Sequence, residues 1–140
     1  MQKKYTSIGL MSGTSGDGID ASVISSNGLD QFEVIKNKYF EYDSKIYKQI
    51  HQLKNQISKI DDLKRLSKEL NELERKITIN HARAIKDLDI KTKDVLIGFH
   101  GQTIYHNAKE KISKQLGDGK LLYQLVRRKI IFNFRKNDIL

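Results

Sequence analysis

A glycine-rich turn between two apolar segments is the feature that most constrains the fold. Residues 5–11 are apolar and β-prone, and residues 19–25 resume that character. Between them, GTSGDGID at residues 13–20 contains three glycines, two hydroxyl side chains and two aspartates. Apolar β-prone segments separated by a glycine turn are typical of a β-hairpin. We therefore expect two antiparallel strands joined around residues 12–18.

The spacing of apolar residues along the rest of the chain predicts an α/β protein. Asn27-Gly28 marks a second tight turn, so a third antiparallel strand is expected. Apolar residues then recur at helical spacing, and Asp43 or Ser44 can cap the first helix. Residues 94–99, DVLIGF, are typical of a strand covered on both faces. The expected order is strands at 5–11, 19–25 and 32–40, helices at 43–57 and 61–88, a strand at 94–99, a helix at 121–128 and a strand at 130–134.

We expect a single domain over residues 1–140, because no proline, internal repeat or low-complexity linker divides the chain. The apolar positions of the helices should face its core. In the first helix these are Ile46, Ile50, Leu53 and Ile57, and in the last they are Leu121, Leu122, Leu125 and Val126.

Composition excludes several classes of function. The net charge is +9, but the lysines are spread among Asp and Glu along the whole chain, KEKISK at residues 109–114 included. This pattern favours a solvated surface over nucleic-acid binding. No apolar stretch approaches the roughly 20 residues that span a bilayer, and the amino terminus lacks a secretory pattern, so we expect no membrane and a cytoplasmic location. With no cysteine, thiol nucleophiles and cysteine metal sites are excluded.

The glycine-rich turn is a candidate phosphate site. It lacks the GK[ST] ending of a P-loop, and a strand rather than a helix follows it, which excludes a dinucleotide fingerprint. Its glycines allow backbone amides to approach an anion, and the Thr14 and Ser15 hydroxyls add donors. Asp17 and Asp20 would repel a bare phosphate, which suggests an accompanying Mg²⁺ ion. A plain surface turn remains the alternative.

Two further motifs carry polar side chains. HGQT at residues 100–103 is expected on a loop at the carboxyl end of the preceding strand, where open α/β sheets bind ligands. His100 fits a structural hydrogen bond or a role at the substrate, and Gln102 and Thr103 fit polar contacts to a hydroxylated ligand. In FRKND, Arg135 could clamp an anion and Asp138 could accept a hydrogen bond, or both could belong to a solvated terminus. The other three histidines, His51, His81 and His106, are expected on the surface or on a helix face.

Four motifs in order resemble the amino-terminal part of the anhydro-N-acetylmuramic acid kinases: IGLMSGTSGDGID at 8–20, IGFHGQT at 97–103, QLGD at 115–118 and FNFRKND at 132–138. The resemblance implies the actin, sugar-kinase and Hsp70 fold, with two ribonuclease-H-like lobes around an ATP cleft. This chain would be the first lobe, a mixed sheet with helices in the order β-β-β-α-α-β-α-β. The family uses ATP and Mg²⁺ to phosphorylate O6 of anhydro-N-acetylmuramate while water opens the 1,6-anhydro ring. The product, N-acetylmuramate 6-phosphate, belongs to cell-wall recycling, and the enzymes are often dimeric.

The resemblance also assigns residues. The ATP phosphate motif is matched by Gly13, Thr14, Ser15, Gly16, Asp17, Gly18, Ile19 and Asp20. The sugar side is matched by Gly101, Gln102, Thr103, Asp118, Arg135 and Asp138. The family's catalytic base lies in a later GFDTGPGN-type segment that would follow Leu140, as does the GGxGAPL stretch. Residues 106–114 also depart from the family pattern, because the usual proline after HGQT is missing.

Three functions remain open from the sequence. The chain could be a kinase piece that needs a second lobe from a partner chain, from a homodimer or from a longer reading frame. It could be a nucleotide-binding remnant without catalysis. It could also be an interaction protein that uses the 61–88 helix, in which case polar changes at Leu66 and Leu73 would abolish self-association. We expect residues 1–140 alone to show no sugar phosphorylation, because one lobe supplies neither the base nor a closed site.

Overall fold

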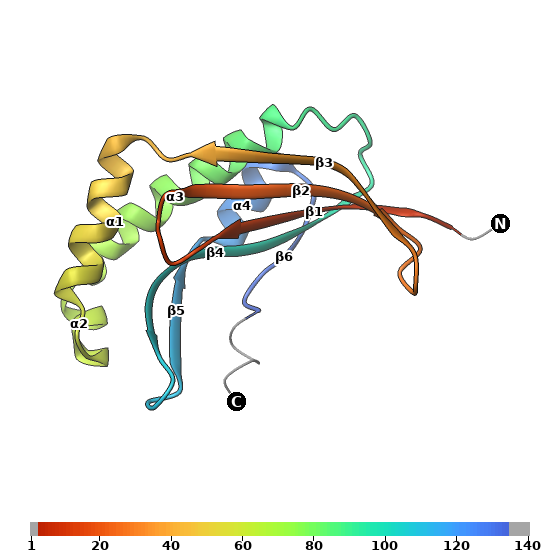
Figure 1. Cartoon of the computed structure of the whole chain (residues 1–140). Helices are drawn as coiled ribbons and strands as arrows, with labels where there is room; N and C mark the ends of the chain where they lie inside the picture. Colours follow the sequence, from red (N-terminus) through yellow and green to blue (C-terminus); the bar gives the residue numbers. More distant parts are fainter. Residues whose placement is uncertain (1–2, 135–140) are drawn as a thin grey trace.

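The protein is built on a mixed six-stranded sheet with helices packed against it. The computed structural model describes residues 3–134. The strands are β1 (Tyr5–Ser12), β2 (Gly18–Ser26), β3 (Phe32–Glu41), β4 (Val95–Asn107), β5 (Ile112–Leu116) and β6 (Lys129–Ile131), and the helices are α1 (Ser44–Gln56), α2 (Ile60–Arg65), α3 (Ser67–Asp87) and α4 (Gly119–Val126). The sheet order is β3-β2-β1-β4-β5, and β6 pairs with β4 (Figure 1). The predicted α/β class with a mixed sheet is confirmed.

The first three strands form the predicted antiparallel ribbon. Leu10 pairs with Ala21 across the first hairpin, and β2 pairs in the same antiparallel sense with β3. β1 then pairs with β4 in parallel, with Ile8 opposite Ile97. The amino-terminal hairpin is thereby fixed to the middle of the sheet.

Among the described residues, only one face of the sheet is covered by helices. Ile97 is fully buried, whereas the side chain of its neighbour Leu96 is 40% exposed. This alternation shows that the expectation of a strand covered on both faces is wrong for residues 94–99. The reason is that α1, α3 and α4 all pack on the same side of the sheet (Figure 1). We call the other side the open face; Met11, Leu96, Gly98 and Ile131 lie on it.

The helical region differs from expectation at one point. α1 begins as predicted, because the Asp43 side chain caps it by accepting a hydrogen bond from the Ile46 amide at 2.9 Å. The single helix expected over residues 61–88 is wrong. The chain breaks at Leu66, whose φ of −97° and ψ of 15° separate α2 from α3. Leu66 and Leu70 are both buried, so the apolar spacing continues across the break and does not reveal it.

The second half of the chain contains a strand that the sequence did not predict. β4 does not end before HGQT but continues to Asn107, so the expected loop at residues 100–103 is wrong. The chain then turns and returns as β5, and residues 112–114 of KEKISK belong to this strand rather than to a lysine-rich surface stretch. Gly101 permits the bend in β4, because its φ is +84° and an added Cβ would lie 2.6 Å from the Leu116 carbonyl oxygen.

The last two elements are shorter than expected. α4 is capped by Asp118 and buries Leu122 completely, but Leu125 is 49% exposed, so its predicted inward position is wrong. β6 ends at Ile131 instead of reaching residue 134. Within residues 3–134, no helix has the combination of length and apolar character that crossing a bilayer requires.

Candidate functional site

The glycine turn, residues 13–17, lies at the tip of the first hairpin, beside α1 and next to the point where β4 bends toward β5 (Figure 1). Thr14, Ser15 and Asp17 are exposed, whereas Gly16 is buried against the protein. The three exposed side chains are therefore accessible from solvent. The following residues Gly18, Ile19 and Asp20 begin β2, and Ile19 is buried in the core.

The carbonyl groups of the glycine turn are held by three different elements. Gln102 of β4 donates from Nε2 to the Gly13 oxygen at 2.7 Å, and Lys54 of α1 donates from Nζ to the Thr14 oxygen. The Tyr42 amide donates to the Asp17 oxygen at 2.9 Å. By contrast, the amides of Thr14 and Ser15 donate to no acceptor within residues 3–134. The turn is thus fixed through its acceptors and keeps donors for an external anion.

Gly16 is required where the turn meets α1. Its φ is +67°, and an added Cβ would lie 2.9 Å from Ile50 Cγ2 and 3.3 Å from His51 Nε2. Both the positive φ and the close approach favour glycine. Sequence reasoning did not identify Lys54 or His51 as neighbours of the turn, because they lie about 40 residues away on an otherwise ordinary amphipathic helix.

A buried chain of hydrogen bonds lies directly before the glycine turn. His81 Nδ1 donates to the Ile77 carbonyl at 2.8 Å, so its Nε2 accepts from Ser12 Oγ at 3.2 Å. Ser12 Oγ in turn accepts from the Tyr42 hydroxyl at 3.0 Å. Burial lowers the pKa of His81 to about 4 and raises that of Tyr42 well above its usual range. His81 is fully buried, so its predicted surface position is wrong.

Position could have identified His81 from the sequence. It follows Ile77 by four residues and precedes Ile85 by four, on the stripe of α3 that faces the core. Its ring also contacts Phe99 of β4 at a centroid distance of 4.9 Å. A histidine in the middle of an apolar stripe is therefore a better indication of a buried hydrogen bond than of an exposed side chain.

The HGQT residues support the glycine turn rather than forming a loop. Gln102 has no exposed surface, and its Oε1 has no partner within the described residues. Thr103 is 9% exposed and accepts from Gln115 Nε2 at 3.3 Å. His100 donates from Nδ1 to the Gly101 carbonyl at 3.0 Å, which is the structural hydrogen bond that the sequence left open. Sugar contacts from these residues stay predictions.

Acidic side chains gather on the β2 and β3 side of the turn. Partial burial, followed by the negative charges of Asp17, Glu41 and Asp20, raises the pKa of the Tyr39 hydroxyl. No group of three His, Cys, Asp or Glu side chains in the described part of the chain could hold a metal ion. Mg²⁺ commonly uses one or two carboxylates and completes its shell with water and substrate phosphates. Two exposed aspartates beside a phosphate site therefore fit Mg²⁺, and its binding stays a prediction.

Asp118 has a clear structural role. It caps α4 by accepting from the Leu121 amide at 3.0 Å, and its own amide donates to Thr78 Oγ1 at 3.0 Å. The structure thus ties Asp118 to α3 and α4, whereas among the sugar-side residues Gln102 is hydrogen-bonded to the glycine turn. Arg135 and Asp138 lie outside the described residues.

Comparison with known proteins points in one direction. A family model described as anhydro-N-acetylmuramic acid kinase matches residues 5–140. The chain is 55% identical over 142 residues to the protein of that name from Pelagibacter ubique, covering 99% of this chain and 38% of that protein. It is 36% identical over 145 residues to the one from Agrobacterium fabrum, covering 99% and 39%, and 33% identical over 142 residues to one from Rhodopseudomonas palustris, covering 96% and 38%. The chain therefore spans less than two fifths of the length of these curated relatives.

Proposed function

Because the chain belongs to the anhydro-N-acetylmuramic acid kinase family, we propose that it forms the part of such a kinase that binds the phosphates of ATP. The observation that carries this proposal is the glycine turn, whose carbonyls are tied to β4, α1 and Tyr42 while the amides of Thr14 and Ser15 remain available. A fixed set of backbone donors suits a phosphate, because no reorganisation is needed when the anion arrives.

The chain's residues would divide the work at the phosphates. The Thr14 and Ser15 amides and hydroxyls would bind phosphate oxygens, and the nearby Lys54 ammonium would add positive charge. Asp17 and Asp20 would hold the waters of Mg²⁺. When bound, Mg-ATP supplies the phosphoryl group and the charge neutralisation that phosphoryl transfer needs.

The acceptor would be the O6 hydroxyl of anhydro-N-acetylmuramate, with hydrolytic opening of the anhydro ring, in cytoplasmic recycling of the cell wall. Gly101, Gln102, Thr103, Asp118, Arg135 and Asp138 would lie toward this sugar. Gly101 would act through the shape of β4, since its Cα is buried against the Leu116 carbonyl. The base would come from the family's later segment, on a second lobe supplied by a partner chain, by another copy or by a longer chain.

A nucleotide-binding remnant is the second candidate, and one observation favours it. Every contact that fixes the glycine turn lies within this chain, whereas the proposed catalytic base does not. The third candidate, self-association through the 61–88 region, has less support. Leu66 and Leu73 are 6% and 1% exposed, so the stripe that would form the interface already packs in the core.

Calorimetric titration of Mg-ATP into the 140-residue chain tests the proposal. The wild type should bind, and Gly16→Ala should weaken binding at least tenfold, because the turn must shift away from Ile50. Gly28→Ala is the matched control, since Gly28 also has a positive φ, +79°, but an added Cβ meets nothing within 4 Å. No binding by the wild type, or equal weakening in both variants, would contradict a phosphate role for the turn.

A further inference from the structure

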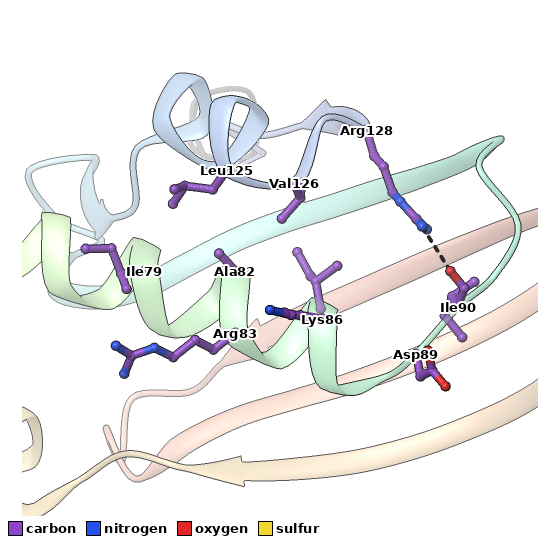
Figure 2. Close-up of a pocket in the computed structure, with 10 residues that line it drawn as sticks. Ile79, Ala82, Arg83, Lys86, Asp89, Ile90, Leu125, Val126 and Arg128 are labelled. Carbon is purple, nitrogen blue, oxygen red and sulfur yellow. Dashed lines mark hydrogen bonds between the residues drawn. The ribbon is translucent and has the colours of Figure 1, made fainter.

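A hollow of about 440 Å³ lies between α3 and α4, on the helical side of the molecule. None of its lining residues belongs to the glycine turn or to the groups that hold the turn. Figure 2 shows side chains from α3, from α4 and from the segments that follow each helix around it. Its volume falls within the range of pockets that hold small organic ligands.

One wall of the hollow is apolar. Leu125 and Val126 of α4 face Ile79 and Ala82 of α3 across it (Figure 2). Leu125 is 49% exposed, although it stands among apolar neighbours on its helix. Covering these side chains would remove apolar surface from water, which stabilises a bound apolar group by about 25 cal/mol per Å².

The other side of the hollow is basic. Arg128 donates from Nη2 to the Ile90 carbonyl at 2.9 Å, which fixes the guanidinium, but its buried Nη1 has no partner within the described residues (Figure 2). A buried donor without an acceptor is costly, because its bond to water is lost. Arg83 and Lys86 line the same hollow, and the lining carboxylate, Asp89, pairs with Lys91 at 3.3 Å.

We propose that this hollow binds a small amphipathic carboxylate. The carboxylate accepts a hydrogen bond from Arg128 Nη1, and the apolar part of the ligand lies between Ala82 and Val126. Arginine suits this role because its planar guanidinium can hold one acceptor with one nitrogen while another remains bound to the protein. The excess of basic over acidic side chains at the rim adds attraction for the acid.

Titration of the ¹⁵N-labelled 140-residue chain with sodium octanoate, followed by amide NMR, tests this proposal. Chemical shift changes should concentrate at Ala82, Ile90 and Val126. Arg128→Gln should weaken octanoate binding at least tenfold. Arg127→Gln is the matched control, because it removes the same charge from the neighbouring position, where the guanidinium lies 5.9 Å from the Tyr123 ring and does not line the hollow.

Two further measurements keep the test decisive. Ala82→Phe should abolish octanoate binding by filling the hollow while Arg128 is intact, and 1-octanol should bind more weakly than octanoate. The proposal is overturned by an absence of shifts, by shifts spread over the lysine-rich surface, or by equal losses in the Arg127 and Arg128 variants. Tighter binding of an acidic amphipathic peptide than of octanoate would assign the hollow to a protein partner instead. Mg-ATP binding should be unchanged in Ala82→Phe, which separates this test from that of the glycine turn.

Discussion

At the scale of single residues, the buried His81 links the stability of the fold to pH. Burial lowers its pKa to about 4, and the charge of His100 acts in the same direction. The unfolded chain therefore binds a proton near the ordinary histidine pKa of about 6.5, whereas the folded chain does not until pH 4. Because the unfolded state binds more protons in this window, stability falls as pH falls through it, by about 3 kcal/mol in total.

His81→Phe should remove this part of the pH dependence. At pH 7.5 the variant should lose about 1 kcal/mol, because Ser12 loses its acceptor. Its free energy of unfolding should then fall less steeply than that of the wild type between pH 6.5 and 5, as measured by urea unfolding. His106→Gln, at an exposed position, is the control and should follow the wild-type slope. Parallel slopes for His81→Phe and the wild type would contradict the assignment.

Gly101 is the second residue on which the fold depends. Gly101→Ala should destabilise the chain by about 2 kcal/mol or more, because it combines a positive φ with a close approach to the Leu116 carbonyl. Gly28→Ala carries the positive φ without the contact, so the difference between the two variants isolates the clash. Thermal unfolding followed by circular dichroism gives both values. Equal losses would show that β4 can move away from β5 without cost.

At the scale of elements, the sequence predicted those whose periodicity is complete. The first hairpin, the capped start of α1 and the capped start of α4 were all predicted, because turn and cap residues act locally. β5 was missed, because lysines in and around residues 112–116 conceal its weak alternation and its pairing partner lies in β4. The position of HGQT within β4 was missed for the same reason, since only the tertiary pairing with β5 extends the strand.

α1 contributes to the site as a whole element. Ile50 and His51 form the surface on which Gly16 lies, and Lys54 holds the Thr14 carbonyl one turn further along. Such contacts join segments about 40 residues apart, so a sequence pattern could not predict them. The glycine turn itself was predicted from its residues, but the groups that fix it were not.

Lys54→Met should therefore weaken Mg-ATP binding about three- to tenfold while it changes the free energy of unfolding by less than about 1 kcal/mol. The loss has two causes, a less firmly held turn and one fewer positive charge. Lys48→Met, on an exposed position of the same helix, removes the same charge and serves as control. Calorimetric titration measures both. An equal loss in Lys48→Met would indicate that net charge alone affects binding.

At the scale of the whole molecule, the α/β chain with its mixed open sheet has the arrangement of the first lobe of a sugar-kinase-type fold. The resemblance in the sequence predicted this architecture before any contact was known. Its open face follows from helices packed on one side only, a property that residue patterns could not reveal. Leu96 and Ile131 contribute exposed apolar surface there, at 40% and 44%.

The isolated chain should give no phosphorylated sugar above background when supplied with Mg-ATP and anhydro-N-acetylmuramate, because it supplies the proposed phosphate grip without the base. A coupled assay for ADP, together with mass spectrometry of the sugar, measures this. Adding the remaining part of the Pelagibacter ubique relative, expressed separately, is the positive arm. Turnover by the purified chain alone would place a complete catalytic site within these residues.

The parallel pairing of β1 with β4 has a consequence for how the molecule assembles. The hairpins of the first three strands involve near neighbours, whereas Ile8 must wait for Ile97, so a large loop closes before the sheet is joined. During synthesis the edge of β1 stays unpaired until most of the chain has left the ribosome, and such an edge invites aggregation. Pulse-labelled hydrogen exchange during refolding should accordingly protect the ribbon amides before those of β4.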